Sequence, residues 1–284
     1  MKTRSSHSTG LLLGVSAYLI WGSFPLIITA TKFANPLEVV VWRVVFGFLF
    51  AAVVLTVIRG WGKIIALLRS PKKLRWLAVA SVFIFINWET YVVAVATGNT
   101  IESSLGYFIN PLITILFAVV FLGERLRTPQ WIALAIGLVA VGVLTFDYGR
   151  PPWIALVLAV SFAIYSLAKN KVGGKIQATQ SFALESLLVI PIALAQLAFV
   201  ASSEHITLLD SPTNAFVLIG FGIMTAVPLI LFGAAASRIP LSTIGFIQYM
   251  TPILQFLTAS FFDGFESIFY FFQIIINADK IIHA

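Results

Sequence analysis

The sequence has no cysteine and few charged residues. The absence of cysteine excludes a disulfide framework and any cysteine-based metal or redox site. Charged residues make up 10% of the chain, whereas a soluble domain averages about 25%. Hydrophobic residues make up 60%, and the mean hydropathy is +1.00. This composition predicts a protein that crosses a membrane several times.

Features typical of enzymes are also scarce. The three histidines, His7, His205 and His283, lie near a terminus or in a predicted loop, so neither a metal-binding pair nor a catalytic triad is visible. The chain has no phosphate-binding glycine-rich loop that ends in GKS or GKT. We therefore predict that it is not an enzyme or an ATP-driven pump, and that it needs no cofactor or metal.

Apolar segments of roughly 20 residues are long enough to cross the lipid bilayer. Full spans are predicted at residues 11–30, 39–58, 76–97, 101–122, 129–147, 152–169, 179–201, 215–237 and 241–262. A tenth apolar segment, residues 265–277, is shorter. The first span follows two basic residues, as in a signal peptide, but its length and the lack of a clear cleavage site favour an uncleaved helix.

Basic residues lie mainly on one side of the predicted spans. The outer loops hold only Lys32 and Arg150, whereas the N-terminus and the inner loops hold nearly all of the others. Because lysine and arginine are enriched in cytoplasmic loops, we predict a cytoplasmic N-terminus. The net charge of +7 therefore reflects membrane topology, and we expect no nucleic-acid partner.

Two stretches with one pattern occur at corresponding places in the two halves of the chain. Pro111 is followed by Gly123, and Pro252 is followed by Gly264 at the same spacing. The spans divide into five and five, and the first and sixth run in opposite directions, as in the inverted repeats of secondary transporters. We therefore predict an all-α membrane protein with an inverted repeat of two five-helix halves. Residues 1–148 would hold helices 1–5, and residues 149–284 would hold helices 6–9 and a truncated helix 10.

Three prolines inside predicted spans, Pro111, Pro228 and Pro252, are predicted to act as kinks or hinges. Proline has no N–H group and clashes with the preceding turn, so nearby carbonyl groups need side chains or cavity water as partners. A single kink would say little, because proline is common in membrane helices, but two kinks at matching repeat positions favour a substrate cavity. The polar neighbours predicted to bind substrate are Tyr107 and Asn110 before Pro111, Thr225 before Pro228, and Gln248 and Tyr249 before Pro252.

Arg43 is an ionisable residue inside a predicted span, where charge is costly and usually functional. It lies at a depth similar to that of Glu102, so a salt bridge between them is one interpretation. The alternatives are that Arg43 extends to the outer interface or pairs with Glu38. If Arg43 faces the cavity, it is a candidate for an anion contact or a gate.

Three acids are candidates for proton coupling: Glu89, Glu102 and Glu185. Glu89 is the deepest, and its alternative role is a hydrogen bond to a neighbouring helix. Glu185 lies near the inner end of its span, where a local partner is the alternative. Asn87 and Trp88 directly precede Glu89, and we include both in the substrate site. Trp21 and Trp88 form either the apolar walls of the cavity or part of an interfacial aromatic belt.

Several motifs resemble one known family. The stretch ESSLGYFINPL at residues 102–112, with FLGER at 121–125 and LSTIGFIQY at 241–249, is similar to RarD-type proteins of the EamA family, in the drug/metabolite transporter superfamily. The resemblance covers about residues 10–264. It implies a ten-helix bundle with a central cavity, and a permease of the inner membrane. Relatives in this superfamily export amino acids and other metabolites.

The sequence departs from the family pattern after Gly264, where relatives continue into a full tenth helix. The tail here predicts a short or aberrant helix, which leaves open both the activity and a homodimer formed through that helix. Our first hypothesis is a secondary transporter that exports a small metabolite or drug by alternating access. The alternatives are a non-transporting remnant and, with less support, a membrane enzyme acting on a lipid-linked substrate.

Overall fold

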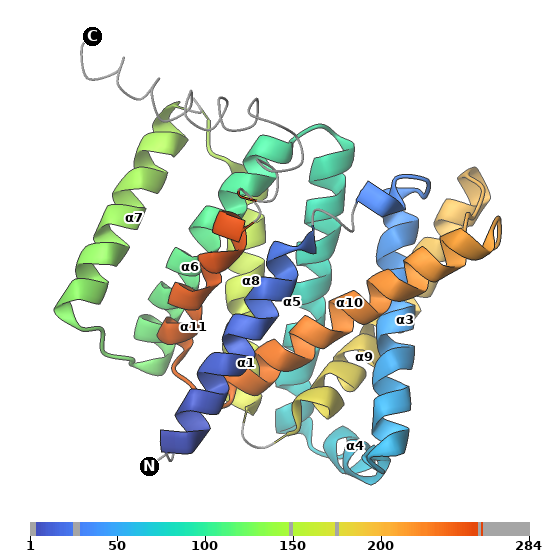
Figure 1. Cartoon of the computed structure of the whole chain (residues 1–284), viewed down its shortest axis with the longest axis horizontal. Coiled ribbons are helices and arrows are strands. Elements are labelled where there is room, and N and C mark those ends of the chain that lie inside the picture. Colours follow the sequence, from blue (N-terminus) through green and yellow to red (C-terminus); the bar gives the residue numbers. More distant parts are fainter. Residues whose placement is uncertain (1–3, 25–28, 148–149, 174–175, 255–256, 258–284) are drawn as a thin grey trace.

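A computed structural model of the chain (Figure 1) describes residues 4–24, 29–147, 150–173, 176–254 and 257. This part is all-α, as predicted, and contains no strand apart from an isolated bridge between Gly173 and Ile176. The elements in order are α1 (Arg4–Gly22), the short 3-10 helix η1 (Thr29–Thr31), α3 (Pro36–Val57), α4 (Trp61–Leu68), α5 (Pro71–Ala96), α6 (Thr100–Leu122), α7 (Thr128–Asp147), α8 (Trp153–Val172), α9 (Ala178–Ser203), α10 (Pro212–Ala236) and α11 (Leu241–Gln248).

Six of these helices are long and apolar enough to cross a membrane: α3, α5, α6, α8, α9 and α10. All six were predicted as spans. Within the first predicted span, α1 stops at Gly22 and Ser23 forms a turn, while residues 25–28 of that span lie outside the described residues. The segment 265–277 and most of 255–262 lie outside the described residues.

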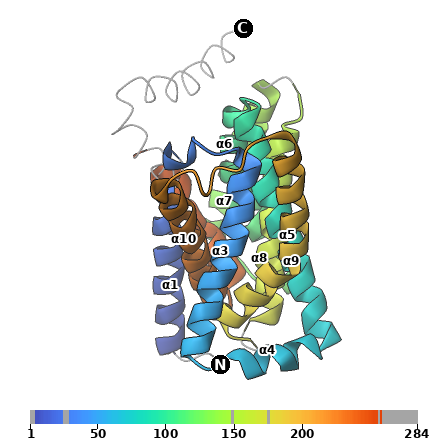
Figure 2. The ribbon, with the colours of Figure 1, turned by 90° about the vertical axis from the view of Figure 1, so that its right-hand side faces the viewer.

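The inner loop between the second and third predicted spans contains a helix that the sequence reading did not foresee. This helix, α4, buries Ile64 and Leu67 on one face and exposes Ile65 and Leu68 on another. It lies across the end of the bundle near the N-terminus of the chain (Figure 2). An amphipathic helix at this place is suited to the membrane interface.

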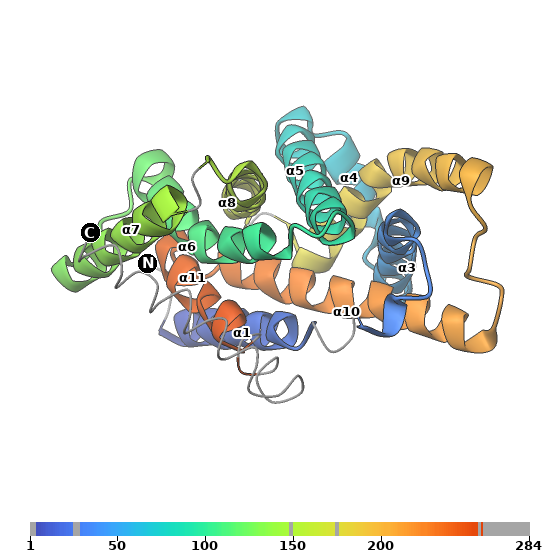
Figure 3. The same ribbon diagram turned by 90° about the horizontal axis from the view of Figure 1, so that it is seen from above.

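Helices from the two halves of the chain interleave. In the view of Figure 3, α7 stands at one edge of the bundle and α9 at the opposite edge. In the predicted repeat, α1, α5 and α6 of the first half correspond to α8, α10 and α11 of the second. The contacts between the halves follow this correspondence: α6 packs on α8 and α11 packs on α1, while α5 packs on α8 and α10 packs on α1. The helices α3 and α9 contact each other, as do α6 and α11. This arrangement fits an inverted repeat, while the boundary near residue 148 stays a prediction.

In the second half of the chain, α11 packs closely against α6 near Pro111. A side chain built on Gly245 of α11 would place its Cβ 2.6 Å from Ile115 Cγ1 and 3.2 Å from the Pro111 carbonyl oxygen. Only glycine allows this approach of the two helices. At its end, α6 is closed by Gly123, which adopts a left-handed φ of 66°. The chain is thereby turned so that Glu124 faces the start of α11.

Candidate substrate site

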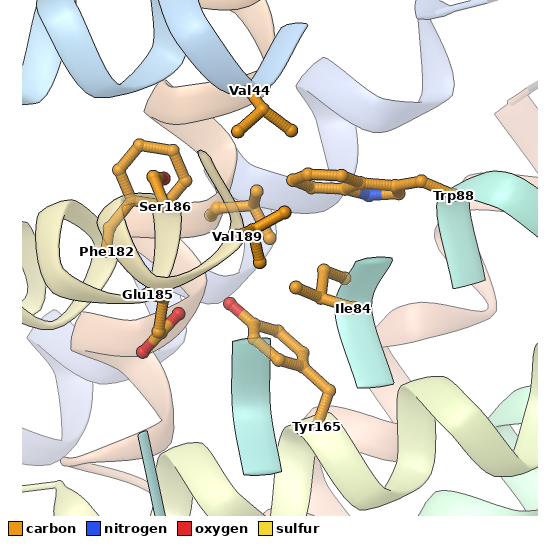
Figure 4. A pocket seen from close by; sticks show the side chains of 9 residues that line it. Val44, Ile84, Trp88, Tyr165, Phe182, Glu185, Ser186 and Val189 are labelled. Atoms are coloured by element: carbon orange, nitrogen blue, oxygen red, sulfur yellow. The ribbon is translucent and has the colours of Figure 1, made fainter. Parts of the chain in front are cut away.

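A narrow hollow lies between helices of both halves. Its volume is about 10 Å³, room for roughly one water molecule and far below the 300–1,000 Å³ of ordinary ligand pockets. Figure 4 shows the side chains around it, with the Tyr165 hydroxyl directed toward the space between Glu185, Val189 and Ile84. The lining residues come from α3, α5, α8, α9 and α10 and are Val44, Ile84, Trp88, Tyr165, Phe182, Glu185, Ser186, Val189 and Leu229.

Glu185, the charged residue that lines this hollow, belongs to a buried ion pair with Lys169. Lys169 Nζ lies 2.8 Å from Glu185 Oε1 and 2.8 Å from Ser181 Oγ. Ser181 also donates to Glu185 at 2.5 Å. Both charged side chains are almost fully buried, at 2% and 3% exposure. Glu185 is therefore paired locally, the alternative that the sequence analysis set beside proton coupling.

Arg43 of α3 sits in a different environment, surrounded by aromatic rings. Its guanidinium carbon lies 4.4 Å from the centroid of Trp88, 5.7 Å from Phe24 and 5.5 Å from Phe221. Trp88 comes from α5, Phe221 comes from α10, and Phe24 lies two residues after the end of α1. Tyr91 and Tyr107, whose rings meet edge to face at 5.9 Å, are close enough to interact electrostatically with Arg43. We call Arg43 with Phe24, Trp88 and Phe221 the arginine box.

Neither expected partner of Arg43 reaches it. Glu102 instead forms a salt bridge with Arg150 at 3.2 Å and accepts a hydrogen bond from the Ile154 amide at the start of α8. Glu38 accepts from the Trp42 indole and from the Thr207 and Leu208 amides. Within the part of the chain that the structure describes, Arg43 has no ion pair, and its enclosed Nε has no hydrogen-bond partner. The predicted Arg43–Glu102 and Arg43–Glu38 pairs are both wrong.

Glu89 has a single described partner. Its Oε1 accepts a hydrogen bond from Gln196 of α9 at 2.9 Å, and the same amide also donates to the Leu37 carbonyl. No cation within the described residues pairs with this carboxyl group. The arrangement is the hydrogen bond to a neighbouring helix that was set beside proton coupling, and it leaves coupling a prediction.

The polar residues near the prolines are used mostly within the bundle. Asn110 accepts from Thr114 at 3.2 Å, and Thr225 donates to the Phe221 carbonyl of its own helix. Asn87 joins α5 to α8 through the Leu158 carbonyl and Ser161. None of these three residues lines the hollow.

The predicted residues of α11 divide between two environments. Tyr249 packs with Leu112 and Leu134 on the side of α7, away from the hollow. Gln248 is buried, and its Oε1 has no hydrogen-bond partner among the described residues. Trp21 belongs to an aromatic cluster with Tyr18, Phe162 and Phe232.

The structure thus brings Arg43, Trp88 and Tyr107 together and places Glu185 and Trp88 on the hollow. Sequence reasoning missed the other rings of the arginine box, Phe24 and Phe221, because apolar aromatic residues in a span give no distinctive signal. It also missed Lys169, which was counted as a loop residue.

Comparisons with known proteins agree with the fold. Residues 8–146 match the EamA-like transporter family. Protein RarD of Streptomyces exfoliatus is 42% identical over 259 residues, which cover 90% of this chain and 81% of that protein. Protein RarD of Escherichia coli is 39% identical, with 90% and 86% covered. A Bacillus subtilis protein named "Uncharacterized transporter YojE" is 35% identical, with 89% and 85% covered.

One solved crystal structure has the same fold. It matches with a TM-score of 0.68 over 89% of this chain and 88% of that one, at 19% sequence identity. At this identity, the likeness concerns the fold alone.

Proposed function

This chain belongs to the EamA-like transporter family as a RarD-type protein, and on that premise we propose that it moves a small metabolite or drug across the cytoplasmic membrane by alternating access. In this proposal the N-terminus is cytoplasmic, and the two halves rock about a central site. The proposed direction of movement is export, as the resemblance of the motifs to this superfamily implies.

The observation that carries the proposal is the position of Trp88. Its ring borders the hollow on one side, and the Arg43 guanidinium lies over it at 4.4 Å. Trp88 therefore lies between Arg43 and the hollow, and the hollow is also lined by Glu185 of the Lys169–Glu185 pair. Polar residues in the interior of a membrane bundle commonly mark a substrate pathway.

The size of the hollow supports movement between states. With a volume of about 10 Å³, it has no room for a metabolite, so the described state is closed around this site. Opening on either side needs helices from both halves to separate, because five helices line the space. Alternating access by relative movement of packed helices supplies such a change.

Glu89 is the acid that we propose for proton coupling. It has no described cation partner and only one described hydrogen bond, from Gln196. Glu102 and Glu185 are less suited, because each is held by a basic residue in the described structure. A carboxyl group that couples to protons has to gain and lose its proton during the cycle, which a strong fixed ion pair opposes.

The test is flux through the purified protein in liposomes against a panel of metabolites and drugs, with and without a pH gradient. We expect protein-dependent flux of at least one compound and a change in its rate when the gradient is imposed. A Glu89→Gln variant should still bind the compound but lose the pH dependence. If the pH dependence stays unchanged in that variant, Glu89 is not the coupling residue.

The non-transporting alternative makes an opposite prediction. A remnant would insert and fold but give no flux for any compound in the panel. A matched chain in which the residues after Gly264 are replaced by a full spanning helix is the informative control. Flux in that chain, with none in the natural one, would overturn the transport proposal for this protein.

A further inference from the structure

We propose that the arginine box recognises the anionic group of the transported compound, so that the substrate is a small organic anion: a carboxylate or phosphate ester carried on an apolar body. This inference rests on the proposed transport function and names the substrate class for it. It follows from how Arg43 differs from the other charged groups of the bundle.

Most other charged groups in the described interior have partners in the protein. Lys169 and Glu185 pair with each other, and Glu102 pairs with Arg150. The remaining acids, Glu38, Glu89 and Glu124, are satisfied by amide, indole or hydroxyl donors. Arg43 alone, within the described residues, is a charge in the bundle with neither a counterion nor a hydrogen-bond acceptor.

The rings of the arginine box stabilise only part of this charge. A guanidinium over a tryptophan face gains cation–π attraction, but ring faces do not accept the N–H bonds that lie in the guanidinium plane. The Nε of Arg43 is enclosed and has no acceptor. Leaving a buried donor without a partner is unfavourable. The site therefore lacks an oxygen acceptor with negative charge, and no described side chain supplies it.

A carboxylate or phosphate group matches this deficiency. Both present two oxygens at the spacing of the guanidinium fork and form charge-assisted, bidentate hydrogen bonds with arginine. A neutral ligand would leave the charge uncompensated, and a cationic ligand would be repelled. Phe24, Trp88 and Phe221 surround the same place with apolar surface, which suits a substrate whose remainder is apolar.

The position of the box connects binding to movement. Its members come from α3, α5, α10 and the segment just after α1, and α10 belongs to the second half of the chain. When these helices close, water is excluded from Arg43, and an unpaired charge in a dry site is costly. An anion that neutralises Arg43 removes this cost, so closure is easier with substrate bound than without it.

The experiment measures binding by the purified full chain in lipid nanodiscs with three probes that share one ring. Benzoate carries a carboxylate, phenyl phosphate carries a phosphate ester, and benzamide is the neutral counterpart of benzoate. Isothermal titration should show that at least one anion binds and that benzamide binds at least about tenfold more weakly, as expected for loss of a charge-assisted pair. The relative affinities of benzoate and phenyl phosphate identify which oxyanion is preferred.

Substitution of Arg43 gives the decisive comparison. Arg43→Gln should weaken anion binding by about tenfold or more and leave benzamide binding unchanged. The matched control is Arg125→Gln, which removes an exposed arginine in the turn after α6 and should bind the anions as the wild type does. If Arg43→Gln does not fold, Arg43→Lys keeps the charge but loses the fork and should still bind the anions more weakly.

The proposal is overturned if neither anion binds the wild-type chain, if benzamide binds as tightly as benzoate, or if both Arg43 variants keep wild-type affinity. Failure of transport gives a different result. A chain that binds anions through Arg43 but moves nothing in liposomes would contradict the proposed function alone. A chain that transports a neutral compound equally well in the wild type and in Arg43→Gln would contradict only the anion inference.

Discussion

Arg43 and Glu185 occupy similar positions in the two halves but have opposite surroundings. Each lies about two turns after the start of its helix, Arg43 in α3 and Glu185 in α9, and these two helices contact each other. Glu185 has a cation and a hydroxyl within 2.8 Å. The guanidinium of Arg43 lies among aromatic rings and has no ion pair within the described residues. Glu185 is therefore a charge with a partner inside the protein, whereas Arg43 is a charge without a counterion among the described residues.

The physical reason for the contrast lies in the desolvation of charge. Two buried ions that meet directly compensate each other, and removal of one leaves the other unpaired in a medium of low polarity. A buried ion without a counterion makes the folded state less stable until a ligand arrives. The Lys169–Glu185 pair should therefore be sensitive to substitution in stability measurements, and Arg43 in binding measurements.

The largest effect on stability should come from breaking the Lys169–Glu185 pair. Lys169→Met leaves Glu185 buried without its cation, and we expect a loss of about 3–5 kcal/mol in the free energy of unfolding. Unfolding of the purified chain in detergent, followed by circular dichroism, measures it. The double variant Lys169→Met/Glu185→Met has no unpaired charge and should recover most of the loss. A double variant less stable than Lys169→Met would show that the pair is not what stabilises this region.

A smaller effect is expected where a carboxylate is satisfied by backbone groups instead of a cation. Glu124 accepts hydrogen bonds from the Leu241 amide at 2.7 Å and the Ser242 amide at 2.9 Å, which begin α11. Glu124→Ala leaves these donors without acceptors and should cost about 1–3 kcal/mol in the same unfolding measurement. The control is Glu204→Ala, which removes an exposed acid bonded to Asn35. Equal stability of the two variants would contradict this role of Glu124.

The smallest effect belongs to an ion pair in water. His205 and Asp210 are 2.6 Å apart in the exposed loop before α10. The hydrogen bond to Asp210, with its negative charge, raises the pKa of His205 above its ordinary value. The pair therefore stabilises the fold fully below the unfolded pKa of about 6.5, and this contribution is lost as the pH rises through the raised pKa. Solvent screening keeps the contribution small.

The measurement for this third prediction is the midpoint of thermal unfolding against pH for the wild type and for His205→Gln. We expect the wild type to be slightly more stable at acidic pH and the two curves to meet at alkaline pH. A difference that grows with pH would contradict the sign of the argument.

The fold was largely predictable from the sequence, and the site was predictable only in part. Long apolar runs indicate spans without knowledge of tertiary contacts, and the predicted spans for α3, α5, α6, α8, α9 and α10 are confirmed. The tertiary partner of a charge is not encoded in local sequence, so a pair of Glu102 with Arg43 was one interpretation, whereas Glu102 pairs with Arg150, 48 positions further along the chain.

Arg43 was predicted as a site residue because of its charge within a span, and Trp88 because of its aromatic ring. In the structure the Arg43 guanidinium lies over the Trp88 ring. Their mutual stacking could not be predicted, because it depends on how α3 and α5 are rotated against each other. Asn87 shows the opposite outcome. It looked suited to a ligand because of its polarity within a span, yet it donates to Leu158 and Ser161 and joins two helices.

The hydrogen bonds of Glu124 also have a consequence for the order in which the chain is made. Its partners at the start of α11 are synthesised 117 and 118 positions later, on the order of ten seconds at typical translation rates. During that interval α6 has already left the ribosome, but the side chain of Glu124 that follows it has no partner yet. Glu102 likewise has no partner until the first turn of α8 has been synthesised. The first five helices therefore enter the membrane as an incomplete assembly, and the later helices complete it as they arrive.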